Sequence, residues 1–316
     1  MTTLRSLFLT AALAFAGCAG TTTQGVTPMS TKSATTTKAT KTGYVQANGL
    51  SYYYEIHGAE GEPLLLLHGG LGSIDMFAPI LPGLAAGRQV IAIDLQGHGR
   101  TALGDRPIDY SAIGDDMAEV LTKLGYTQVD ALGYSFGGGV AFRLAVQHPK
   151  LVRRLALVSA GFAQDGFYAE MLPQQAAVGA GLADMMKNTP MYTSYAAVAP
   201  HPEEFPKLLD RMGELMRKPY NYAEDVKQLA PQTLLVFGDS DMYRPEHIVE
   251  YFQLLGGGKR DAGWQREHQG RHRLAILPNT THYDMFMSPL LVPTVRPFLD
   301  GTQAGASWAE QVEKRP

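Results

Sequence analysis

The sequence predicts an α/β fold, in which helices flank a mainly parallel sheet of about eight strands. Short apolar segments alternate with helical patterns along most of the chain, and this alternation is typical of a parallel sheet. The segments are continuously apolar, so we expect them to be buried on both faces of the sheet. One long segment, residues 161–230, contains no such strand and predicts an inserted helical cap.

The first two strands are expected at residues 44–46 and 51–56, because Asn48-Gly49 between them favours a tight hairpin turn. The later strands follow the apolar segments 64–67, 90–93, 129–132, 154–159, 233–237 and 274–277. Helices are expected at residues 111–124, 136–148, 245–255 and 284–299. The predicted order is therefore one hairpin followed by repeated strand and helix units.

The cap segment holds six of the 13 methionines and five of the 15 tyrosines. These side chains suit an adaptable, largely apolar pocket for a small-molecule substrate, because Met fills irregular space and Tyr adds a hydroxyl group. They suit the cap's own core equally well, and the sequence leaves the two readings open. A second interruption, the polar loop 256–272, carries Trp264 and several arginines just before the last strand.

Composition and charge exclude several classes of protein. Of 316 residues, 45% are hydrophobic and 18% are charged, which is a globular composition. One cysteine cannot form an internal disulfide. The net charge of −3 and the lack of a basic block argue against nucleic acid as a partner.

The first 42 residues differ from the rest of the chain. They carry a charge of +4 without any acidic residue, whereas residues 43–316 carry −7. Arg5 precedes an apolar stretch, residues 7–16, that is shorter than the roughly 20 residues needed to span a bilayer. This layout predicts a secretory signal peptide over residues 1–17.

The next segment is rich in threonine and serine, with ten Thr and two Ser among residues 21–42. Such a composition buries too little apolar surface to fold, so residues 18–42 are expected to be a tether. One domain is then expected over residues 43–300, with a polar C-terminal tail over residues 301–316.

The four residues Phe15-Ala16-Gly17-Cys18 resemble the lipobox of bacterial lipoproteins at their last three positions. The resemblance implies that Cys18 becomes the lipidated N-terminus, attached to the periplasmic side of a bacterial membrane. An ordinary signal peptide, giving a soluble periplasmic or secreted protein, is the alternative.

The strongest chemical signal is Gly-Tyr-Ser-Phe-Gly at residues 133–137, between an expected strand and an expected helix. Small residues allow a sharp turn that lifts the hydroxyl of Ser135 out of the backbone. The following helix would direct its free N–H groups at an oxyanion forming beside Ser135. A helix-capping serine in a glycine-rich turn is the alternative reading.

A serine nucleophile needs a base and a group that orients the base. Of the nine histidines, His282 follows the last expected strand and would lie at the same sheet edge as Ser135. The acid is expected after the preceding strand, where both Asp239 and Asp241 are available. The residues alone do not decide between these two carboxylates.

Residues 44–300 resemble the α/β-hydrolase superfamily in four motifs. These are His-Gly-Gly-Leu-Gly-Ser at 68–73, Asp-Leu-Gln-Gly-His-Gly at 94–99, the segment 133–138, and the segment 238–245 followed by His282. The order Ser, Asp, His is also that of the superfamily. The resemblance implies that Asp241 is the triad acid, with Asp239 as the alternative.

The same resemblance implies an oxyanion hole formed by the backbone N–H groups of Phe136 and Gly70, with Leu71 as an alternative to Gly70. We expect His68 and His98 to shape loops, since their spacing with Asp94 fits no common metal site. No metal and no organic cofactor is expected.

The expected reaction is the hydrolysis of a carboxylic ester or related acyl bond through an acyl-enzyme on Ser135. A lactonase, a carbon–carbon bond hydrolase and a cofactor-free haloperoxidase on the same fold are alternatives. A weakly catalytic ligand-binding protein is the alternative from another class.

Overall fold

The computed structural model describes residues 38–302 and 305–313. The predicted signal peptide and Cys18 lie outside these residues, as does most of the predicted tether. Among the residues described, no helix is both long and apolar enough to cross a membrane.

Eight strands form one sheet, with the order β1-β2-β4-β3-β5-β6-β7-β8. Their bounds are Lys41–Ala47, Leu50–His57, Leu64–Leu67, Val90–Ile93, Val129–Tyr134, Val152–Val158, Gln232–Ser240 and Arg273–Thr281, for β1 to β8 in chain order. The pairs β1–β2 and β2–β4 are antiparallel, and all other neighbours are parallel. The predicted α/β fold class, with a mainly parallel eight-stranded sheet, is confirmed.

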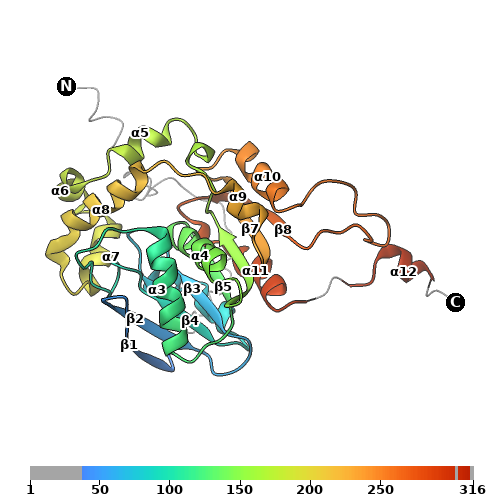
Figure 1. The fold of residues 1–316 in the computed structure, drawn as a ribbon, viewed down its shortest axis with the longest axis horizontal. Helices are drawn as coiled ribbons and strands as arrows, with labels where there is room; N and C mark the ends of the chain where they lie inside the picture. Colours follow the sequence, from blue (N-terminus) through green and yellow to red (C-terminus); the bar gives the residue numbers. More distant parts are fainter. Residues whose placement is uncertain (1–37, 303–304, 314–316) are drawn as a thin grey trace, which may run out of the picture.

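Helices cover both faces of the sheet (Figure 1). Alternate side chains of each buried strand point to opposite faces, so Leu65 and Leu67 pack in one core while Leu64 and Leu66 pack in the other. The first core includes side chains of α3 (Tyr110–Lys123), α4 (Phe136–Gln147) and α10 (Pro245–Leu254). The second includes those of α2 (Leu81–Ala85) and α11 (Leu291–Leu299).

The segment expected to form the cap is helical. Its helices are α5 (Met171–Ala176), α6 (Ala183–Met186), α7 (Pro190–Val198), α8 (Phe205–Arg217) and α9 (Ala223–Lys227). Figure 1 shows α5, α6, α7 and α8 grouped at one end of the molecule, while α12 (Trp308–Glu313) lies at the opposite end.

Two boundaries differ from those expected. Strand β1 starts at Lys41, inside the predicted tether, and Thr40 already donates to the carbonyl oxygen of Ile56 from its N–H and its hydroxyl group. β1 starts earlier than expected because β2 is long enough to pair with it as far as Lys41, opposite Ile56.

The second difference is at residues 284–299, where one helix was expected. A short 3-10 helix, Met285–Met287, and α11 stand there instead. Ser288 between them is extended, with ψ at 126°, because Pro289 disfavours helical geometry in the residue before it.

Candidate active site

Ser135 lies at the junction of β5 and α4 in a backbone conformation that is rare for a residue with a side chain. Its φ is 52°, and left-handed values of this kind cost about 1–3 kcal/mol. The surrounding backbone holds it there: its N–H donates to the carbonyl oxygen of Val158 at 2.9 Å, and its own carbonyl oxygen accepts from the N–H groups of Gly138 and Gly139.

The glycines on either side of Ser135 are required by close packing. A Cβ atom on Gly133 would lie 2.2 Å from the carbonyl oxygen of Gly137. A Cβ atom on Gly137 would lie 2.4 Å from the carbonyl oxygen of Leu67. Glycine at these two positions allows β5, the turn and α4 to pack this closely. α4 can therefore begin directly after Ser135, with its N-terminus beside the hydroxyl group.

The structure brings together Ser135, His282 and Asp241 from the ends of three parallel strands. Nε2 of His282 lies 3.0 Å from Oγ of Ser135, and Nδ1 lies 3.0 Å from Oδ1 of Asp241. His282 and Asp241 are only 6% and 7% exposed, so bulk water does not compete strongly for these contacts.

The carboxylate of Asp241 determines which nitrogen of the His282 imidazole carries the proton. Burial on its own raises the pKa of Asp241, but the hydrogen bonds and charge of His282, with the Ser159 hydroxyl and the Gly238 N–H, hold that pKa below its ordinary value. An ionised carboxylate can only accept, so Nδ1 of His282 carries the proton. Nε2 is then free to accept the proton of the Ser135 hydroxyl group.

Asp239, the alternative acid, lies apart from His282 and is exposed. Its two carboxylate oxygens accept from the backbone N–H groups of Asn279 and Thr280 on β8, at 3.0 and 3.2 Å. Those hydrogen bonds lower its pKa. This carboxylate binds the strand that leads to His282, and it does not contact the imidazole.

Two residues that support the site were not singled out from the sequence. Ser159, buried at the end of β6 with φ at 50°, donates its hydroxyl to Oδ2 of Asp241 at 2.6 Å. Tyr134 donates to the carbonyl oxygen of His282 at 2.5 Å. The one signal that could have found both is their position at the carboxyl ends of buried strands.

The expected oxyanion donors lie close together. A Cβ atom on Gly70 would lie 3.7 Å from Cβ of Phe136, the first residue of α4. Within residues 38–302 and 305–313, no acceptor engages the backbone N–H of Gly70, Leu71 or Phe136. Leu71 follows Gly70 in the same turn and has φ at 57°. The backbone N–H groups of both residues are without an acceptor in the described part of the chain, so both stay candidates for the second donor.

His68 and His98 hold the loops behind these donors. His68 donates from Nδ1 to the carbonyl oxygen of Gly69 and accepts the N–H of Leu95 at Nε2. Burial lowers the pKa of His68 to about 4 and that of His98 to about 3, so both rings are neutral at pH 7. Among the residues that the structure describes, no three His, Cys, Asp or Glu side chains form a group that could bind a metal ion.

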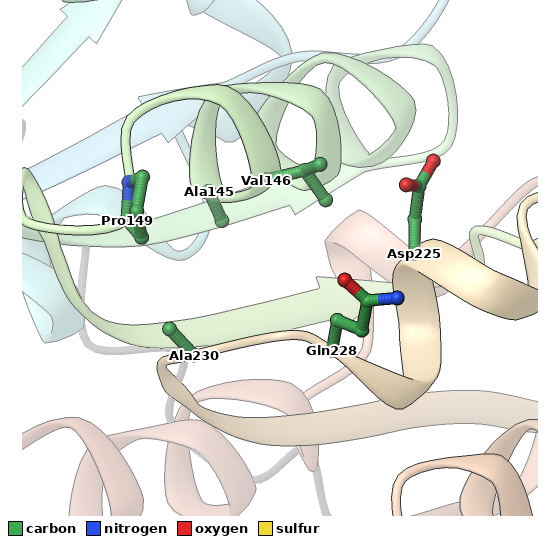
Figure 2. A pocket seen from close by; sticks show the side chains of 6 residues that line it. All are labelled: Ala145, Val146, Pro149, Asp225, Gln228 and Ala230. Carbon is green, nitrogen blue, oxygen red and sulfur yellow. The ribbon is translucent and has the colours of Figure 1, made fainter.

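Cap helix α8 packs onto the same loops. A Cβ atom added to Gly70 would lie 3.1 Å from Cε of Met212. A Cβ atom added to Gly97 would lie 3.0 Å from Cδ1 of Leu208. By contrast, a cavity of about 190 Å³ lies away from the triad, between the end of α4 and α9 (Figure 2). Its lining contains none of Ser135, Asp241 and His282, and consists of Ala145, Val146, Pro149, Asp225, Gln228 and Ala230.

Comparison with known proteins agrees with this fold. The sequence model described as the alpha/beta hydrolase fold matches residues 62–190. A stretch of 111 residues is 39% identical to an sn-1-specific diacylglycerol lipase of Xenopus tropicalis, covering 34% of each chain. A stretch of 109 residues is 40% identical to a 2-hydroxymuconate semialdehyde hydrolase of Pseudomonas sp., covering 32% of this chain and 38% of that one.

The whole domain also resembles solved structures. A thermophilic esterase from Thermogutta terrifontis matches with a TM-score of 0.65 and 18% identity, over 84% of this chain and 100% of that chain. The chain spans less than half the length of the curated relatives named above. The α/β-hydrolase fold inferred from the four motifs is confirmed, and residues 62–190 match the sequence model of that fold.

The geometry predicts different effects for two matched substitutions. Asp241→Asn should lower kcat by about 10⁴-fold, since the amide no longer holds the proton on Nδ1 of His282. Asp239→Asn should leave kcat within about tenfold of wild type, because that carboxylate only binds the β8 backbone. Steady-state kinetics on an activated ester would compare the two, and full activity in Asp241→Asn would contradict the assignment.

Proposed function

We propose that the protein is a serine hydrolase that cleaves a carboxylic ester or related acyl bond of a small, largely apolar substrate. The observation that carries the proposal is the continuous chain of hydrogen bonds from Asp241 through His282 to Ser135. In this arrangement an otherwise weak hydroxyl nucleophile has a base within reach, and the base has a fixed tautomer.

The reaction follows from the position of each atom. Nε2 of His282 takes the hydroxyl proton of Ser135 while Oγ forms a bond to the substrate carbonyl carbon. The carbonyl oxygen becomes an oxyanion, held by the N–H groups of Phe136 and Gly70. When the carbonyl re-forms, the ester C–O bond breaks, and His282 gives its proton to the leaving alkoxide.

The second half of the reaction releases the acid. Water replaces the alcohol, gives a proton to Nε2 of His282 and attacks the acyl carbon. The bond to Oγ then breaks, and the proton returns from His282 to Ser135. Asp241 stays ionised throughout and stabilises the imidazolium that forms in both halves.

The surroundings of the triad support an apolar substrate. The ring of Tyr110 lies 5.6 Å from that of Phe136, and the ring of Tyr243 lies 6.4 Å from that of His282. With Met212 against Gly70, aromatic and thioether side chains flank the reacting atoms. Such a lining favours apolar acyl or alcohol groups.

A fluorophosphonate probe would test the nucleophile directly. We expect the probe to label wild type and a matched Ser111→Ala variant, and to leave Ser135→Ala unlabelled. Ester hydrolysis by Ser135→Ala should fall by roughly 10⁶-fold. Absence of labelling in wild type would contradict the proposal and favour a protein that only binds its ligand.

The relative named as a 2-hydroxymuconate semialdehyde hydrolase justifies a wider substrate panel. Activated esters, lactones and ring-cleavage products should be compared at equal concentration. The proposal predicts the highest kcat/KM for esters. A higher kcat/KM for lactones or for ring-cleavage products would contradict it and would assign that class as the substrate.

Export and lipid attachment at Cys18 form a separate part of the proposal. They are supported by the apolar stretch 7–16, by Ala16-Gly17 before the cysteine and by the Thr-rich segment after it. Mass spectrometry of the mature protein should find a diacylglyceryl-modified Cys18 at the N-terminus, with the modification absent from Cys18→Ser. An unmodified N-terminus at another residue would contradict it.

A further inference from the structure

Two tryptophans form an exposed aromatic pair at α12. This helix lies at the end of the molecule opposite to α5, α6 and α7 (Figure 1). Trp264 lies in the loop before β8 and Trp308 begins α12; their ring centroids are 5.0 Å apart. The two side chains are 73% and 63% exposed, although tryptophan is among the residues that gain most from burial. They are the only two tryptophans of the chain.

The loop around this pair has the opposite charge to the rest of the domain. Residues 256–273 carry +3, whereas the remainder of residues 43–316 carries −10. The loop's five cations are Lys259, Arg260, Arg266, Arg271 and Arg273. In the part of the chain that the structure describes, no ion pair involves any of them.

The loop's own acids do not neutralise these cations. Asp261 accepts the backbone N–H of Gly263, and Glu267 accepts that of Gln265. Both carboxylates therefore brace turns of the loop. Arg266, Arg271 and Arg273 donate to backbone carbonyl oxygens. Lys259 and Arg260 are therefore the cations of the loop that are most available to a negatively charged partner.

A cavity of about 700 Å³ lies between this loop and β8, the edge strand of the sheet. Lys259, Arg260 and Arg273 line it together with the apolar side chains of Phe252 and Ile276. Ile276 is 48% exposed. The cavity thus combines positive charge with apolar side chains, and it is lined by the same loop that carries Trp264.

We propose that residues 256–273 and α12 form a docking surface for an anionic lipid bilayer. Lys259 and Arg260 would bind lipid phosphates, while Trp264 and Trp308 would enter the interfacial region, where indole rings are most stable. The charge of +3 on residues 256–273 selects this occupant, since the remaining domain is acidic and would be repelled by the same membrane. Docking of this kind is independent of the Ser135 chemistry.

Intrinsic fluorescence tests the proposal, because both tryptophans of the chain lie in this surface. The full chain with Cys18→Ser, which removes the site of lipid attachment, would be mixed with vesicles of equal parts phosphatidylglycerol and phosphatidylcholine. We expect a blue shift of tryptophan emission and quenching by brominated lipid. Both should be lost in high salt and absent with pure phosphatidylcholine vesicles.

Matched charge variants separate this surface from the rest of the protein. Lys259→Gln/Arg260→Gln should weaken vesicle binding by roughly 10- to 30-fold, at about fivefold for each cation near an anionic surface. Lys187→Gln/Lys207→Gln removes the same charge from the cap, at the C-terminal end of α6 and within α8, and should change vesicle binding by less than about twofold. Circular dichroism would show that both variants are folded.

Three results would overturn the proposal. One is unchanged emission at saturating phosphatidylglycerol vesicles. Another is an equal blue shift with uncharged vesicles. The third is a blue shift that grows with protein concentration in the absence of lipid, together with a dimer in sedimentation, because a second copy of the chain would then cover the tryptophans.

Discussion

The site depends on one chain of hydrogen bonds, from Asp241 to Nδ1 of His282 and from Nε2 to Oγ of Ser135. The three residues are distant in sequence, and only the parallel sheet brings them together. β5, β7 and β8 all end at the same edge, so the turns that follow them meet there. Each turn is then held by a specific contact: Ser135 by the N–H bond to Val158, Asp241 by Ser159, and the His282 carbonyl by Tyr134.

Buried polar groups make this edge rigid, and each needs its partners. The carboxylate of Asp94 accepts the backbone N–H groups of Ile74 and Arg100. Burial raises the pKa of Asp94 to about 6, against the effect of these donors and of the Arg100 side chain. Together with His68, this carboxylate ties the loop after β4 to the loop that carries Gly70. The loops that carry the expected oxyanion donors are therefore held by buried hydrogen bonds that lie behind them.

Much of the fold could be predicted from the sequence, because strands such as Leu64–Leu67 and Val90–Ile93 are continuously apolar and buried on both faces. Ser135 and His282 were singled out because each follows an expected strand, and Ser135 also lies in the Gly-Tyr-Ser-Phe-Gly motif. The choice between Asp239 and Asp241 could not be made from the residues alone, since it depends on which carboxylate faces the imidazole. Ser159 and Tyr134 were missed for the same reason: their partners, Asp241 and the His282 carbonyl, are more than 80 residues away in sequence. The start of β1 at Lys41 was also missed, because the backbone partners on β2 determine it more than the Thr-rich composition does.

The central claim is that Asp241 alone holds a proton on Nδ1 of His282, which leaves Nε2 to accept from Ser135. Proton NMR of the imidazole N–H resonances, assigned with a His282→Gln variant, measures this most directly. The account predicts a low-field resonance from the Nδ1 proton of His282 that persists in Asp239→Asn and disappears in Asp241→Asn. A resonance that survives in Asp241→Asn, or one that is lost in Asp239→Asn, would contradict it.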